Sequence, residues 1–136
     1  MEATELRLIL GRAGLSARRL GSAIARAQLP PGTAAVEALL RRPATALRQL
    51  GLSPAASAWF SAPDQELVER DRRWLERHGI VLLDVFASDY PPLLAAISDA
   101  PALLYARGTV AALSAPQLAI VGTRMPTLPG QRTSMH

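Results

Sequence analysis

A long helical pattern that ends in a glycine and passes directly into an apolar run dominates the middle of this sequence. From Gln65 to His78, apolar residues recur at helical spacing between charged ones, and Gly79 ends the pattern. The next six residues, Ile80 to Val85, are all apolar except Asp84, which is typical of a buried strand. Helix, glycine and buried strand together begin an α/β layer, so we expect the second half of the chain to build a sheet.

Two further runs support this expectation. Leu103 to Ala106 and Gln117 to Val121 are short, apolar and bounded by proline or glycine, as strands are. The fold class expected is therefore mixed α+β and α/β: a helical bundle, then the first strands of an incomplete Rossmann-like parallel sheet. The chain stops soon after the third run, so we expect it to be a piece of a longer protein.

The first sixty residues have a different character. Glycine and proline divide them into five short amphipathic segments, each long enough for two or three helical turns. Ser61-Ala62-Pro63 then forms a plausible boundary, and Asp64 is a good cap for the helix that follows. We therefore predict two domains, a helical module over residues 1–62 and the beginning of a sheet domain over residues 64–136.

Composition excludes several classes of site. The chain has no cysteine and two histidines, so thiolate metal sites are excluded and a metal site is not expected. An acidic amino end and the lack of an apolar run of about 18 residues argue against a secretory signal and a membrane span, which favours a cytoplasmic protein. The formal net charge is +4, and every basic side chain is arginine. That balance fits a polyanion partner, but it also fits ordinary solubility.

Enzyme motifs are missing from the sequence. It contains neither a nucleoside-triphosphate loop nor a complete dinucleotide fingerprint, so no nucleotide cofactor is expected. No serine or cysteine nucleophile can be matched with a histidine, and the acids of residues 65–78 have the spacing of a solvated helix face. We predict no catalytic residues.

The third apolar run carries the main candidate site. Val121 passes directly into Gly122, Thr123 and Arg124. A glycine at the end of a buried strand brings free backbone N–H groups to the crevice where open α/β sheets bind anions. Thr123 would add a hydroxyl and Arg124 a charged fork for a phosphate. The alternative is an ordinary strand-to-helix turn with a solvated arginine.

Several short motifs, taken in order, resemble a known family. They are Tyr90-Pro91-Pro92-Leu93-Leu94, Asp99-Ala100-Pro101, Leu103 to Gly108, and Ala119 to Arg124 with Pro126, Thr127 and Gly130. Their order and spacing resemble the opening of the DprA (Smf) domain of DNA-processing proteins. The helical module ahead of them is similar to that family's amino-terminal domain, which is related to sterile-alpha-motif and helix-hairpin-helix folds.

The resemblance implies a function. It implies a non-catalytic protein of natural transformation that binds single-stranded DNA, protects it and helps load the recombinase RecA. It assigns Gly122, Thr123 and Arg124 to the DNA pocket, and it implies a homodimer in complete family members. The alternative from another class is an enzyme of the lysine-decarboxylase-like phosphoribohydrolase type, whose downstream glutamate motif is absent here.

A second basic patch is a weaker candidate. The pairs Arg18-Arg19 and Arg41-Arg42, with Arg26 and Arg48, lie in the helical module, where related modules turn toward phosphates. The alternative, a solvated helix face, is the favoured explanation of these arginines. We expect the Tyr90-Pro91-Pro92 turn to be structural, and Tyr105 and Trp74 to belong to the core rather than to stack on bases.

Overall fold

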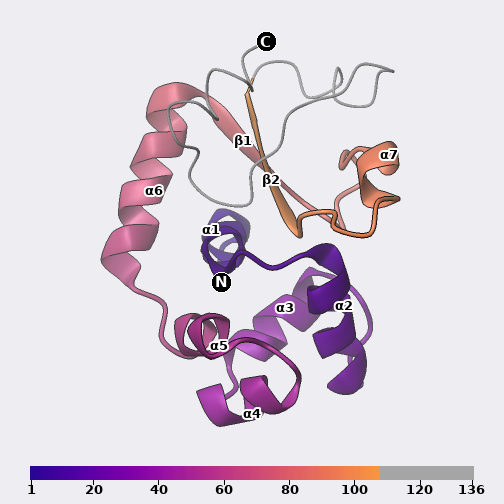
Figure 1. The fold of residues 1–136 in the computed structure, drawn as a ribbon. Coiled ribbons are helices and arrows are strands. Elements are labelled where there is room, and N and C mark those ends of the chain that lie inside the picture. Colours follow the sequence, from indigo (N-terminus) through magenta and orange to yellow (C-terminus); the bar gives the residue numbers. More distant parts are fainter. Residues whose placement is uncertain (108–136) are drawn as a thin grey trace.

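A computed structural model describes residues 1–107 of the chain. Figure 1 shows the helix α1 lying between the strands and the remaining helices of the N-terminal module, with α6 along one side and α7 beside the strands. The elements, in chain order, are α1 (Ala3–Ala13), α2 (Ala17–Arg26), α3 (Thr33–Leu40), α4 (Ala44–Gln49), α5 (Pro54–Ser61), α6 (Gln65–His78), β1 (Ile80–Asp84), α7 (Pro92–Ala95) and β2 (Leu103–Arg107).

The five helices expected before residue 62 are present, and local capping explains where some of them begin. The Ser16 hydroxyl accepts a hydrogen bond from the backbone N–H of Arg19 at 3.2 Å, at the start of α2. The Ser53 hydroxyl does the same for Ala56 at 3.1 Å, at the start of α5. Each cap satisfies a backbone donor that the first turn of a helix leaves without a partner.

Helix α6 and strand β1 follow the sequence pattern closely. The Asp64 carboxylate accepts hydrogen bonds from the backbone N–H groups of Glu66 (3.0 Å) and Leu67 (3.4 Å). At the other end, Gly79 has φ 62°, a left-handed conformation in which a side chain would be strained. The chain therefore leaves the helix sharply and enters β1 at the next residue.

The two strands pair in the antiparallel sense, so this pair is not the parallel pair expected from the sequence. Ile80 lies opposite Arg107, and Asp84 lies opposite Leu103. A parallel pair needs a crossover that carries the chain back to the starting end of the first strand. The connection here contains only the four-residue α7, and it re-enters the sheet at the end where β1 stops. The third expected strand, Gln117 to Val121, lies outside the described residues.

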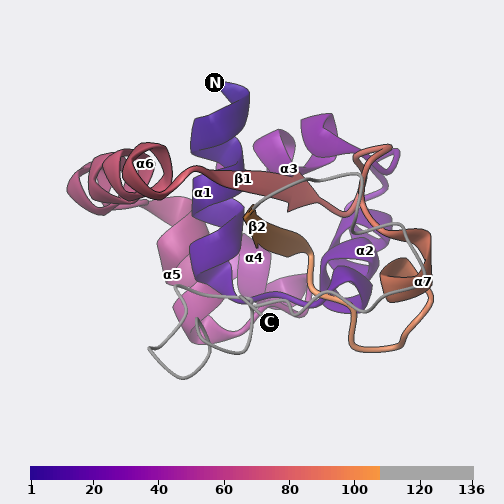
Figure 2. The same ribbon diagram turned by 90° about the horizontal axis from the view of Figure 1, so that it is seen from above.

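The strands are buried on both faces, which explains why β1 is almost continuously apolar. Side chains of a strand point alternately to opposite sides. Leu82 and Leu103 belong to the main core around α1, whereas Leu83 and Leu104 form a smaller cluster with Tyr90. In Figure 2, β1 runs across α1, the helix that supplies the fully buried Leu8 and Ile9 of the main core.

Candidate nucleic-acid interface

The main candidate residues, Gly122, Thr123 and Arg124, lie outside the described residues. Their role in phosphate binding stays a prediction. The described structure does show the framework from which the predicted site would extend: the antiparallel pair β1–β2 and the helices that hold it.

The Arg18–Arg19 pair lies in the first turn of α2, and both side chains are exposed. This end of α2 is fixed to the sheet domain, because Ser16 forms an isolated β-bridge with Pro101. The backbone N–H of Ala17 donates to the Ala100 carbonyl at 2.7 Å, and that of Ala102 donates to the Leu15 carbonyl at 3.1 Å. The two arginines therefore lie next to the segment that leads into β2.

The Arg41–Arg42 pair lies at the far end of α3, where the chain turns toward α4. Arg41 makes an ion pair with Glu37 at 3.4 Å, and its side chain is 78% exposed. Within residues 1–107, no hydrogen bond or ion pair joins this pair to Arg18 or Arg19. The first arginine pair thus lies at the start of α2 and the second at the end of α3.

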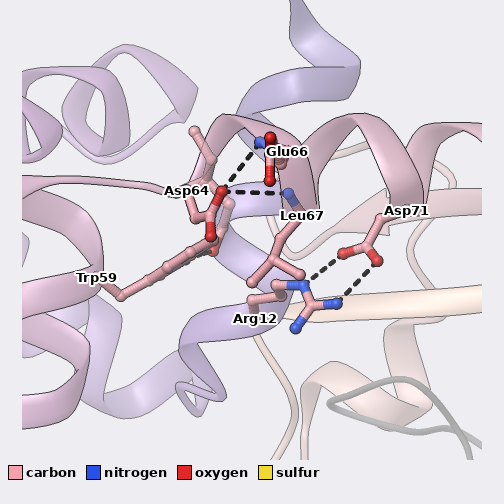
Figure 3. A network of polar contacts seen from close by, with 7 residues as sticks. Arg12, Trp59, Asp64, Glu66, Leu67 and Asp71 are labelled. Carbon is pink, nitrogen blue, oxygen red and sulfur yellow. Dashed lines mark hydrogen bonds and ion pairs between the residues drawn. The ribbon is translucent and has the colours of Figure 1, made fainter.

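A buried ion pair joins α1 to α6. The Arg12 guanidinium donates two hydrogen bonds to the Asp71 carboxylate, from Nε at 2.5 Å and from Nη2 at 2.9 Å (Figure 3). The Asp71 side chain is 1% exposed and that of Arg12 is 30% exposed. The hydrogen bond with Asp71 raises the pKa of Arg12 above its ordinary value, so the Arg12 guanidinium stays charged.

The burial of Asp71 corrects the interpretation of all α6 acids as solvated. The sequence did contain a signal for it. Val68, Asp71 and Leu75 have the i, i+3, i+7 spacing of one helix face, and all three are buried. A carboxylate in the middle of such a face needs a cation that comes from elsewhere in the fold. That cation comes from α1, 59 residues away in the chain.

A second ion pair joins α1 to β1. Arg7 Nε donates to the Asp84 carboxylate at 2.9 Å, and Arg7 Nη1 donates to the Leu82 carbonyl at 3.3 Å. The other carboxylate oxygen of Asp84 accepts the backbone N–H of Phe86 at 2.9 Å, which shapes the turn after the strand. Two of the module's arginines are therefore structural and are not available to a polyanion.

Two aromatic side chains also hold segments together. The Trp59 indole N–H donates to the Ile9 carbonyl at 2.7 Å and so links α5 to α1. The Tyr90 hydroxyl donates to the Pro101 carbonyl at 2.7 Å, and burial raises the pKa of Tyr90 to about 12. The expectation that the Tyr90-Pro91-Pro92 turn is structural is confirmed. Trp74 and Tyr105 pack against the main core, also as expected.

Comparison with known proteins bears on this same region. The family model described as "DNA recombination-mediator protein A" matches residues 82–136, which begin within β1 and include Gly122 to Arg124. A curated relative, Protein Smf of Escherichia coli strain K12, is 34% identical over 89 residues. Over these residues the chain is similar to proteins of the DprA/Smf family.

The match with Smf is limited in extent. It covers 65% of this chain and 24% of the relative, so the chain spans about a quarter of the length of the Smf protein it matches. No solved structure matches the chain. The described part of the family match comprises most of β1, α7 and β2. Asp84 and Tyr90 make hydrogen bonds in the segments that connect these elements.

Two kinds of feature are absent from residues 1–107. No group of three or more histidine, aspartate and glutamate side chains could hold a metal ion there. Within the same residues, no helix has both the length and the apolar character needed to cross a membrane.

Proposed function

We propose that this chain binds single-stranded DNA through the segment Gly122–Thr123–Arg124 and acts as a non-enzymatic recombination mediator. The observation that carries the proposal is the match of the recombination-mediator family over residues 82–136, because it includes this segment. The arginine surplus agrees with it, since the chain has a formal net charge of +4 and Asp99 is its last acidic side chain.

The chemistry of the segment fits a phosphate. The apolar run that ends at Val121 predicts a buried strand, and Gly122 lets the backbone turn so that its N–H groups face a phosphate oxygen. Arg124 supplies a planar set of donors that can hold a phosphate through two hydrogen bonds. No base is read by such a site, so the binding is independent of sequence.

Protection of the strand and its transfer to RecA complete the proposal. A protein that holds the phosphates leaves the bases accessible, and a recombinase can then assemble on the same strand. We also propose the cytoplasm as its location, which stays a prediction.

Fluorescence anisotropy with labelled oligonucleotides of different sequence tests the proposal on the full chain. We expect Arg124→Ala to weaken binding to all single strands alike and to lower the slope of log affinity against log salt by about 0.7. Arg77→Ala, on the exposed side of α6, removes the same charge and is expected to have little effect. Unchanged binding by Arg124→Ala would remove this residue from the site.

Transfer to RecA has a separate readout. We expect the chain to shorten the lag of RecA filament formation on the oligonucleotide, and Arg124→Ala to lengthen it again. A lag that the chain leaves unchanged would reject the RecA step, although DNA binding could still stand.

A further inference from the structure

Helix α2 has one face that carries only arginines and small residues. On a helical wheel the residues Arg18, Ser22 and Arg26 follow one another at i, i+4 and i+8, and Arg19 lies at the edge of the same face. All of these side chains are exposed, as are the intervening Gly21 and Ala25, whereas Leu20, Ala23 and Ile24 on the opposite face are buried. The basic face is thus a defined half of one helix.

Within residues 1–107, no ion pair joins an arginine of this face to an acidic side chain. The helical module contains three acids, Glu2, Glu5 and Glu37. Glu2 pairs with Arg72 at 2.8 Å, and Glu37 lies within 3.5 Å of the amino terminus and of Arg41. The undescribed residues 108–136 bring no acidic side chain, because Asp99 is the last in the sequence. Residues 108–136 therefore supply no acidic partner to the arginines of α2.

The fold adds Arg48 to the basic face. A Cβ atom built on Gly51 would lie 2.8 Å from Nη1 of Arg26, so the Arg26 guanidinium rests on the turn that follows α4. Gly51 has φ 96°, and its backbone N–H donates to the Arg48 carbonyl at 3.0 Å. Arg48 is exposed in the last turn of α4, one turn before Gly51. Arg26 and Arg48, which are 22 positions apart in the sequence, therefore both border the turn at Gly51.

We propose that Arg18, Arg26 and Arg48 bind the phosphate backbone of single-stranded nucleic acid, as a second contact besides Gly122–Arg124. This inference rests on the proposed function and adds a second contact to the one at Gly122–Arg124. We call the row of Arg18, Arg26 and Arg48 the track. Arg18 and Arg26 are about 12 Å apart along the helix axis, and only small side chains lie between them, so a strand can approach α2 closely. No aromatic side chain belongs to the α2 face, so the contact is made with phosphates and carries no base preference.

This assignment changes the second patch expected from the sequence. Arg41 is paired with Glu37, and the Arg41–Arg42 pair lies at the end of α3. Arg26 and Arg48, which the sequence also placed in this patch, stay in it, because the contact at Gly51 brings α2 and the end of α4 together.

Anisotropy titrations of the full chain with an oligothymidine, repeated at several salt concentrations, test the track. We expect the double variant Arg26→Gln/Arg48→Gln to lower the affinity about tenfold or more at low salt, and the salt slope by about 1.4, or about 0.7 for each lost contact. The matched control Arg70→Gln/Arg77→Gln removes the same charge from the exposed side of α6 and should leave the slope close to that of the wild type.

The charge-preserving variant Arg26→Lys/Arg48→Lys should retain the wild-type slope, which separates charge from any change in folding. A wild-type slope in Arg26→Gln/Arg48→Gln, while Arg124→Ala still weakens binding, would overturn the track and leave the proposed function standing. A wild-type chain that fails to bind the oligothymidine would overturn both. A stronger effect of the double variant on duplex than on single strands would overturn the assignment to single strands.

Discussion

At the scale of single residues, two buried tyrosines occupy opposite situations. The Tyr90 hydroxyl has a partner, the Pro101 carbonyl at 2.7 Å. The Tyr105 hydroxyl is buried and has no hydrogen-bond partner within residues 1–107. A buried hydroxyl loses its bonds to water, and of these two hydroxyls only that of Tyr90 has a replacement partner among the described residues. The same chemical group therefore stabilises the fold at one position and weakens it at the other.

Removing each hydroxyl should show this difference. We expect Tyr90→Phe to lower the free energy of unfolding by about 1 kcal/mol, because it breaks a satisfied hydrogen bond. We expect Tyr105→Phe to leave the free energy unchanged or to raise it by up to about 1 kcal/mol, since it removes a group without a partner. Urea unfolding followed by circular dichroism measures both, and a clear loss of stability in Tyr105→Phe would contradict the description of its hydroxyl.

The same two residues predict how stability depends on alkaline pH. Burial raises the pKa of Tyr90 and of Tyr105 from 10.0 to about 12. As the pH rises, the unfolded chain therefore loses these protons before the folded chain does. The free energy of unfolding is thus constant with respect to these two groups below about pH 10 and falls as the pH rises toward 12. Tyr105→Phe should make this loss shallower in unfolding measurements across that range.

At the scale of elements, the close approach of β2 to α1 decides how the sheet sits on the helical module. Gly11 makes this approach possible. A Cβ atom built there would lie 2.6 Å from Cδ2 of Leu103 and would overlap the Tyr105 hydroxyl. Glycine weakens a helix interior, so its presence here is explained by packing between elements rather than by local preference.

A pair of glycine substitutions separates packing from helix propensity. Gly11→Ala should lower the free energy of unfolding by about 2 kcal/mol, because β2 must move away from α1. Gly21→Ala is the matched control: Gly21 lies within α2 and its Cβ would have no neighbour within 4 Å. This second change should raise stability by up to about 1 kcal/mol. Equal effects of the two changes in chemical unfolding would mean that packing at Gly11 is unimportant.

At the scale of the whole described chain, the helical module and the strands share one core. The main cluster contains Leu8 of α1, Leu75 of α6 and Leu103 of β2. The ion pairs Arg12–Asp71 and Arg7–Asp84 cross the same boundary. Packing therefore continues across the predicted division between residues 62 and 64, and we expect the two parts to unfold together. The division into two domains stays a prediction.

Breaking the Arg12–Asp71 pair tests this coupling. Arg12→Gln leaves a carboxylate that is 1% exposed without its countercharge, which should cost about 3 kcal/mol. Circular dichroism, which follows all helices, and the fluorescence of Trp59 and Trp74 should still give coincident transitions in urea. Arg72→Gln is the control, and its loss of stability should be much smaller than that of Arg12→Gln, because its partner Glu2 is 60% exposed. Separate transitions would show that the module unfolds independently.

Local patterns were sufficient to predict much of this protein. Helical spacing, the caps Ser16, Ser53 and Asp64, and Gly79 are properties of neighbouring residues, so they predicted the five helices of the module, α6 and β1. The motif order predicted the DprA/Smf family. The predicted site at Gly122, Thr123 and Arg124 depends on this order, and no described residue tests it.

Tertiary structure decided what these patterns leave open. The direction of β2 depends on where an 18-residue connection returns to the sheet, and the strand pattern is the same for both directions. The burial of Asp71 depends on an arginine 59 residues away, and the meeting of Arg26 with the Gly51 turn depends on how α2 and α4 pack. A sequence specifies local conformation through neighbours, whereas the choice of distant charges that meet is made by the packing of the core.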